Sequence, residues 1–315
     1  MVGGAGFIGS HFCDRLLGDS ETRKVTIYDN FSSGREWHYE HHLKDSRFNA
    51  VRGDVKDLSL LEATMAGHDI CIHLASNPDI ARAAIDPQVD FYEGTLLTNN
   101  VVEAMRRSDC HRILYASGSG VYGDLGEIAA HEDWGPLLPV STYGASKLSG
   151  EALIMSYCAM FDLSGCAFRF GNVVGPRQTH GVGFDFVRRL LREPERLSIL
   201  GDGSQSKSYI HIEDVVSAVL HAHRTSPKRF DVFNVATGDY ITVTEIAELA
   251  VDCLQLEHVR FEYSGGSRGW KGDVPMVRLN TDRIESLGWT CRNNCRAALR
   301  SSLMALIEDA RAGRL

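Results

Sequence analysis

The 315-residue sequence has few of the features that mark membrane, metal-binding or nucleic-acid-binding proteins. No run approaches the roughly 20 apolar residues of a membrane span, and residues 1–4 lack the basic and apolar regions that open a signal peptide. The eight cysteines form no Cys-x-x-Cys pair, and the closest two, Cys291 and Cys295, have no nearby His or Cys cluster to complete a metal site. The net charge of −8 argues against binding to a phosphate backbone. We therefore expect a cytoplasmic protein with mostly buried, reduced thiols, no metal, and neither a membrane nor a nucleic-acid partner.

The composition and the order of apolar patterns predict an α/β fold. With 43% hydrophobic and 23% charged residues, the chain resembles an ordinary globular protein, long enough for one large domain and a smaller lobe. Short β-branched runs at residues 25–28, 48–52, 70–74, 112–116 and 165–170 alternate with helical patterns at residues 8–17, 58–66, 99–107 and 142–161. This alternation predicts a Rossmann-type, doubly wound parallel sheet.

The pattern changes after Asn172. Loops that contain Gly and Pro separate short helical patterns at residues 184–191, 212–223 and 244–254. We assign residues 1–172 to the Rossmann domain and residues 173–315 to a smaller α/β lobe that binds the substrate. Because we expect the chain to cross between the two more than once, this boundary is approximate.

A Gly-x-x-Gly-x-x-Gly turn from Gly3 to Gly9 leads into the first helical pattern. Glycine permits tight turning and close backbone approach, and the helix N-terminus offers unpaired N–H groups and a positive dipole end to a pyrophosphate. Only Met1 and Val2 precede the turn, where a complete central strand is expected. Either the chain begins late, from an alternative start, or this strand is unusually short.

Two carboxylates support a dinucleotide site. Asp29 ends the first β-branched run, about 20 residues beyond the last glycine, where it can accept hydrogen bonds from ribose hydroxyls and repel a 2′-phosphate. Asp54 follows the next run, where it can meet an adenine edge. Although Arg35 lies nearby, the arrangement favours NAD over NADP.

Tyr143 and Lys147 are four residues apart, so a helix places them on one face. A free phenol titrates near pH 10, and a phenolate base at neutral pH therefore needs a shift of about three units, or roughly 4 kcal/mol. Lys147 and the positive nicotinamide ring of NAD⁺ can together supply that stabilisation. In a chain with a dinucleotide turn, the pair predicts an acid–base couple that works beside hydride transfer.

The ordered motifs resemble those of extended short-chain dehydrogenases/reductases, in particular the NAD-dependent nucleotide-sugar epimerase/dehydratase family. The likeness runs from residues 3–10 to Gly272 and Asp273, and so spans nearly the whole chain. The motifs between them lie at residues 73–76, 117–123, 143–147, 169–176, 200–203 and 209–214. They are most similar to those of UDP-glucose and UDP-glucuronate 4-epimerases.

The resemblance implies the residues of two binding sites. Those expected at NAD are Gly3, Gly6, Phe7, Ile8, Gly9, Asp29, Asn30, Ser33, Asp54, Val55, Leu74, Ala75, Ser76, Tyr143 and Lys147. Those expected at a UDP-sugar are Asn172, Arg177, His180, Leu200, Lys207 and Arg268. Lys207 stands where the relatives usually have arginine, and a lysine offers phosphate a point charge without a bidentate fork.

The loop at residues 117–120 departs from the family pattern. Position 118, where the relatives usually present a Ser or Thr to the reacting hydroxyl, is glycine. Either a neighbouring serine, Ser119 or Ser117, assists Tyr143, or Tyr143 acts unaided; we expect Ser119. Gly120 stands where the dehydratases carry a glutamate, which favours epimerisation over dehydration and, more weakly, over decarboxylation.

These inferences predict an NAD-dependent 4-epimerase that acts on UDP-glucose/galactose or UDP-glucuronate through a transient 4-keto sugar. A dehydratase, decarboxylase or reductase of the same family is the alternative, and a non-catalytic NAD-binding regulator is a remote one. Relatives commonly dimerise through helices equivalent to residues 99–107 and 142–161, so we also expect a homodimer.

Overall fold

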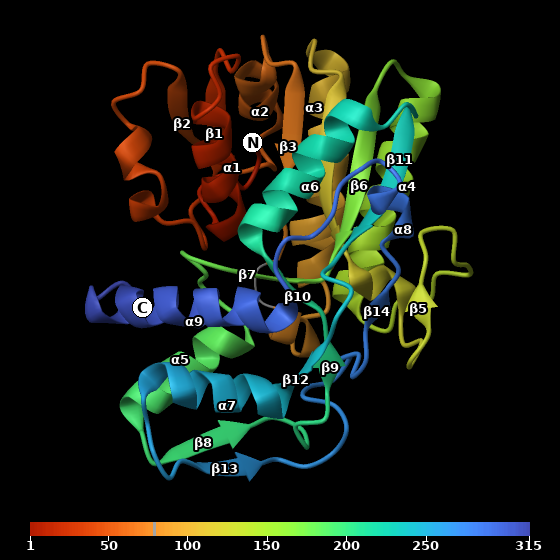
Figure 1. The fold of residues 1–315 in the computed structure, drawn as a ribbon. Coiled ribbons are helices and arrows are strands. Elements are labelled where there is room, and N and C mark those ends of the chain that lie inside the picture. The colour runs from red at the N-terminus through yellow and green to blue at the C-terminus, as the bar shows by residue number, and fades with distance from the viewer. Residues whose placement is uncertain (78–79) are drawn as a thin grey trace. The chain divides into compact units, whose positions relative to one another are not determined.

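The computed structural model describes residues 1–77 and 80–315, and the chain passes repeatedly between two compact units (Figure 1). The first unit contains Met1–Val121, Thr142–Arg169 and Val219–Phe233, and the second contains Tyr122–Ser141, Phe170–Ala218 and Asn234–Leu315. The structure thus divides the chain differently from a single boundary at residue 172. Two segments cross that boundary: Tyr122–Ser141 belongs to the second unit, and Val219–Phe233 returns to the first.

The first unit is built on one sheet whose strands lie side by side in Figure 1. Strand β1 (Val25–Asp29) pairs in parallel with β2 (Phe48–Arg52), and β3 (Ile70–His73) pairs in parallel with β4 (Arg112–Gly118). Strands β6 (Ser164–Phe170) and β11 (Phe230–Val235) extend the sheet beyond β4. The predicted parallel α/β sheet is confirmed, and β11 is the late strand that the sequence analysis did not include.

Met1 and Val2 lie where the central strand is expected. Val2 bridges Tyr28 of β1 and His73 of β3, both in parallel. Its N–H donates to the carbonyl of Ile72 at 2.9 Å, and the N–H of Tyr28 donates to the carbonyl of Met1 at 2.8 Å. Two residues therefore suffice to join β1 and β3 into a single sheet at the point where the glycine turn begins.

Helices cover both faces of this sheet because the strand side chains alternate. Val25 and Ile27 pack with Cys13 and Leu17 of α1 (Phe7–Leu17). Tyr28, which follows Ile27 and points to the opposite face, packs in a cluster with residues of three other helices. These helices are α2 (Leu58–Met65), α3 (Leu96–Arg107) and α4 (Thr142–Met160). Single-turn segments complete the unit: η1 (Glu36–His38), η2 (Glu40–His42), η3 (Ile80–Ala84), η4 (Phe91–Thr95) and η5 (Ser119–Tyr122).

The second unit is a smaller α/β assembly with its own core. Helices α5 (Val182–Arg192), α7 (Val243–Leu254) and α9 (Cys295–Arg311) share a cluster of buried residues with β8 (Arg196–Ile199), which pairs in parallel with β13 (Arg260–Tyr263). The remaining strand pairs are β7 (Asn172–Val174) with β10 (Tyr209–His211), β9 (Ser206–Lys207) with β12 (Ile241–Thr242), and β5 (Ala129–Ala130) with β14 (Arg278–Leu279). Helix α6 (Ile212–Thr225) passes from this unit into the first, and α8 (Asp282–Glu285) is a single turn. Among the helices of the described residues, none combines the length and apolarity needed to cross a bilayer.

Candidate functional site

The glycine turn fits closely against the backbone around it. A Cβ atom at Gly3, whose φ is +78°, would lie 2.6 Å from the backbone nitrogen of Ala75. A Cβ at Gly9 would lie 2.6 Å from the Cα of Gly4. Gly6 caps α1 without any side-chain hydrogen bond, so within residues 1–77 and 80–315 no side chain caps the first N–H groups of this helix. A narrow turn before an uncapped helix N-terminus suits a pyrophosphate.

Asp29 holds the turn to the loop that follows β1. Its Oδ2 accepts the N–H of Ala5 at 2.9 Å, and its Oδ1 accepts the N–H of Phe31 at 2.8 Å. Each carboxylate oxygen can accept a second hydrogen bond, so the group retains capacity for ribose hydroxyls. The guanidinium of Arg35 donates back to the carbonyl of Gly34 at 3.1 Å.

The other residues expected at the cofactor follow the carboxyl ends of neighbouring strands. Asn30 and Ser33 come after β1, the exposed Asp54 and buried Val55 after β2, and residues 74–76 after β3. The N–H groups of Leu74 and Ala75 share the carbonyl of Val2, at 2.8 and 3.1 Å. Parallel strands end at one edge of a sheet, so the structure brings these residues to the same edge as the glycine turn.

Tyr143 and Lys147 lie one turn apart at the start of α4. Lys147 is 3% exposed, and its Nζ donates to the carbonyl of Ala116 at 2.7 Å. The same Nζ lies 5.5 Å from the centre of the Tyr143 ring and 5.2 Å from that of Tyr115. The phenol of Tyr143 forms a hydrogen bond with Ser76. Helical spacing therefore brings the pair together as predicted, within the first unit.

Burial sets the proton affinities of both groups. It raises the pKa of Tyr143, as does the charge of Asp90, while the hydrogen bond with Ser76 lowers it. Burial lowers the pKa of Lys147 to about 8, although Asp90 and Glu151 favour its charged form. At pH 7 the lysine therefore remains mostly an ammonium, and the phenol keeps its proton until further positive charge approaches.

Two buried acids that the sequence analysis did not single out surround this pair. Asp90, 1% exposed, accepts hydrogen bonds from Asn77 Nδ2 at 2.8 Å and from Thr142 Oγ1 at 2.6 Å. Glu151 pairs with Arg169, whose Nη2 lies 2.7 Å from Oε2. Glu151 follows Tyr143 and Lys147 at the same four-residue spacing, a helical signal by which it could have been found. Asp90 has no comparable signal in the sequence.

The loop at residues 117–120 contains two serine hydroxyls, and among the described residues only that of Ser117 has a hydrogen-bond partner. Ser117 is buried and donates to Glu151 Oε1 at 2.5 Å. Ser119 is partly exposed, and its hydroxyl has no hydrogen-bond partner among the described residues. A Cβ at Gly118 would meet nothing within 4 Å, whereas one at Gly120 would lie 3.5 Å from the Cα of Gly144 on α4. This geometry leaves Ser119 more available to a ligand than Ser117.

In the second unit, two of the cations expected at a diphosphate meet at one residue. Lys207 Nζ lies 2.6 Å from Oδ1 of the buried Asp273. Arg268 donates to the backbone carbonyl of Asp273, and its Nη2 lies 2.7 Å from Oδ2 of Asp124. In the sequence Asp273 stands only as part of the Gly272–Asp273 motif, whereas in the structure it contacts both cations.

The other expected substrate residues lie on separate elements of the second unit. Asn172 opens β7, where its Nδ2 donates to the carbonyl of Ser208 at 3.2 Å. Arg177, with a φ of +66°, and His180 lie in the loop before α5, and Gln178 between them accepts a hydrogen bond from Ser302 of α9 at 2.8 Å. Leu200 follows β8 and is 52% exposed.

Comparison with known proteins decides the family. Residues 1–236 match the NAD dependent epimerase/dehydratase family. The chain belongs to this family. A UDP-glucose 4-epimerase of Mycolicibacterium smegmatis is 32% identical over 302 residues, which cover 92% of each chain. UDP-glucuronic acid decarboxylase 4 of Arabidopsis thaliana is 29% identical over 320 residues, which cover 99% of this chain and 68% of that protein.

Solved structures agree with this assignment. A crystal structure of a UDP-galactose 4-epimerase is 33% identical, with a TM-score of 0.87 and 98% of each chain covered. The predicted family, its NAD dependence and the Rossmann-type fold are therefore confirmed, whereas these relatives differ in the reaction that they catalyse.

Proposed function

We propose that this member of the epimerase/dehydratase family is an NAD-dependent 4-epimerase of a UDP-sugar. The observation that carries the proposal is the pairing of the partly buried Tyr143 with the buried Lys147, in a region whose two buried carboxylates already have partners. Asp90 is held by Asn77 and Thr142, and Glu151 by Arg169 and Ser117. With glycine at position 120, the loop supplies no further acid for elimination of water.

The residues of the first unit suit NAD. The glycine turn and the N-terminus of α1 would hold the pyrophosphate, and Asp29 the adenosine ribose. Bound NAD⁺ would supply a hydride acceptor and a positive charge beside the phenol. That charge matters because burial and the charge of Asp90 both raise the pKa of Tyr143.

Tyr143 would carry the proton in both directions. As phenolate it accepts the proton of the C4 hydroxyl, while Lys147 keeps a positive charge within 5.5 Å of its ring. After the 4-keto sugar has turned over, the phenol returns the proton to the oxygen on C4. One group can act as base and then as acid because the charge beside it changes between the two steps. Ser119, with its unengaged hydroxyl, would orient the reacting oxygen.

The Lys207–Asp273–Arg268 cluster would receive the diphosphate. Both cations are partly exposed, at 21% and 44% of their side chains, and so can turn toward a ligand. Asp273 would keep them in position between turnovers. Anchoring by the diphosphate leaves the sugar free to present either face of C4.

We further propose a homodimer in a reducing compartment such as the cytoplasm. Val101, Val102 and Met105 of α3 are fully buried in the core and so are not available for a partner. Exposed Phe91, Tyr92 and Met155 instead offer apolar contact on η4 and α4. Sedimentation velocity at micromolar concentration tests the dimer.

All eight cysteines are free thiols, six of them buried, as expected where disulfides do not form.

Incubation of the purified protein with single UDP-sugars tests the proposed reaction. UDP-glucose, UDP-galactose, UDP-glucuronate and UDP-N-acetylglucosamine are each followed by NMR without added NAD. We expect inversion at C4 for at least one of them, with no net change in cofactor. Loss of water or CO₂ would assign the dehydratase or decarboxylase reaction instead, and no conversion of any sugar would contradict an epimerase acting on these substrates.

A further inference from the structure

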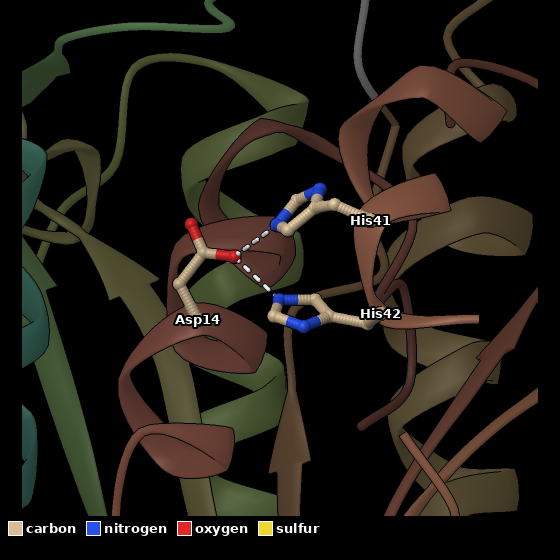
Figure 2. A group of neighbouring side chains, drawn as sticks. All are labelled: Asp14, His41 and His42. Atoms are coloured by element: carbon tan, nitrogen blue, oxygen red, sulfur yellow. Dashed lines mark hydrogen bonds and ion pairs between the residues drawn. The ribbon is translucent and has the colours of Figure 1, made fainter. Parts of the chain in front are cut away.

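A cluster of metal-ligating side chains lies in the first unit and has no role in the proposed reaction. Asp14 projects from α1, and the adjacent His41 and His42 end η2 (Figure 2). The Nε2 atoms of His41 and His42 lie 2.9 and 2.6 Å from the same Oδ1 of Asp14. The ligand atoms all lie within 4.8 Å of one another, and no other trio of His, Cys, Asp or Glu in residues 1–77 and 80–315 comes this close.

We propose that Asp14, His41 and His42 form a binding site for a divalent transition-metal ion, with Zn²⁺ as the best match. Two imidazole nitrogens and one carboxylate oxygen are borderline donors of the kind that Zn²⁺ prefers. Mg²⁺ and Ca²⁺ instead require shells of oxygen atoms. Three protein ligands leave the fourth tetrahedral position to water.

The geometry needs only a small adjustment. At Zn–N and Zn–O bond lengths of about 2.0–2.2 Å, tetrahedral ligand atoms lie roughly 3.3 Å apart. The two N···O distances of 2.9 and 2.6 Å must therefore widen by about half an ångström. The side chains of His41 and Asp14 are 51% and 36% exposed and can move, whereas His42 is 15% exposed and its ring lies 5.8 Å from that of Phe48. One anchored and two adaptable ligands suit such an adjustment.

Both imidazoles can adopt the tautomer that a metal requires. Each Nε2 currently shares a hydrogen bond with Oδ1, and neither ring has another hydrogen-bond partner among the described residues. The proton can therefore sit on Nδ1 of each ring and face water, which leaves the Nε2 lone pair for the ion.

The bound ion would connect two elements next to the cofactor residues. Asp14 lies on the helix that follows the glycine turn, and the histidines lie in the β1–β2 connection that begins at Asn30. The ion would tie this connection to α1 across 27 residues of sequence. Because an ion that binds only the folded chain stabilises it, Zn²⁺ should raise the melting temperature.

Calorimetric titration of the EDTA-stripped, full-length protein with ZnCl₂ tests the site. We expect one ion per chain, micromolar affinity and a rise in melting temperature, and no binding of MgCl₂. Asp14→Asn and His42→Gln keep the size and hydrogen bonding of the side chains, and each should weaken Zn²⁺ binding at least about tenfold. His131→Gln, at an exposed histidine of the second unit, is the matched control and should bind like the wild type.

Two results would overturn the proposal: a wild-type Kd weaker than about 1 mM, or unchanged affinity in the Asp14 and His42 variants. If either variant fails to fold, the wild type loaded with Co²⁺ decides the matter. Intense visible absorption of a four-coordinate ion supports the site, and the weak spectrum of hydrated Co²⁺ contradicts it.

Discussion

The candidate site residues of the two units differ in how their charged side chains are held. In the first, Lys147, Asp90 and Glu151 are buried, and each has partners within the protein. In the second, the partly exposed Lys207 and Arg268 converge on Asp273. A group that must hold a proton at one place needs a fixed environment, whereas a cation that binds phosphate must exchange its protein partner for the ligand. This contrast fits proton transfer, which we propose for the first unit, and diphosphate binding, which we propose for the second.

The largest effect should follow removal of the phenol. Tyr143→Phe should lower turnover by about 10²–10⁴-fold, because general acid–base catalysis contributes on that scale. NAD binding, measured by fluorescence or calorimetry, should persist. Tyr157→Phe removes a hydroxyl from the same helix, where it donates to Glu103 at 3.3 Å, and should leave turnover unchanged. A Tyr143→Phe enzyme with more than a tenth of wild-type turnover would exclude this residue as the acid–base group.

The buried ion pair should matter for folding. Glu151→Gln breaks a buried ion pair by removing the carboxylate that faces Arg169, which should cost about 3–5 kcal/mol of unfolding free energy. Urea denaturation measures the loss. Glu103→Gln, which faces Arg106 and Arg107 on the more exposed surface of α3, should cost about 1 kcal/mol or less. Equal losses in the two variants would show that burial does not strengthen the dependence of folding on the Glu151–Arg169 pair.

The buried lysine should make stability depend on pH. The pKa of Lys147 falls from 10.5 to about 8 on folding, so between these values the unfolded chain binds more protons than the folded one. The stability associated with this lowered pKa is fully present above pH 10.5 and is lost as the pH falls to about 8. Over this window the unfolding free energy changes by up to about 1.4 kcal/mol per pH unit. The difference in unfolding free energy between the wild type and Lys147→Met should therefore rise over this window. A flat difference would indicate an ordinary lysine.

A substitution in the glycine turn tests the part of the site that depends only on the backbone. Gly9→Ala places a Cβ 2.6 Å from the Cα of Gly4 and should destabilise the turn by about 1–3 kcal/mol, with weaker NAD binding. Gly118→Ala is the control for stability, because its Cβ meets nothing within 4 Å. If both variants unfold at the same urea concentration, the turn is looser than the contacts indicate.

The smallest effect should come from the exchangeable cation. Lys207→Gln should raise KM for the UDP-sugar about tenfold, equivalent to about 1.4 kcal/mol, and should change kcat little. Lys271→Gln, at an exposed lysine in the same unit, should change neither constant. An unchanged KM in Lys207→Gln would show that the diphosphate binds elsewhere, and a large fall in kcat would place Lys207 among the groups that act on the reacting centre.

Much of the first unit was predictable from the sequence, and less of the second. The predicted helix at residues 142–161 is α4, Thr142–Met160, and Tyr143 and Lys147 lie on it as expected. Ser117 shows the limit of this approach, since its engagement with Glu151 depends on a partner 34 residues away. The same holds for β11, because it lies beside β6 in the sheet although the two strands are far apart in the sequence.

The sequence by itself determined the alternation of strands and helices, the glycine turn and the one-turn spacing of Tyr143 and Lys147. These features follow from backbone geometry over a few residues, where the chain has few alternatives. Only the tertiary structure decided that Lys207 pairs with Asp273, 66 residues away, and that His41 and His42 share an oxygen of Asp14. A chain with 33 basic and 41 acidic side chains offers many compatible partners, and packing of distant segments selects among them.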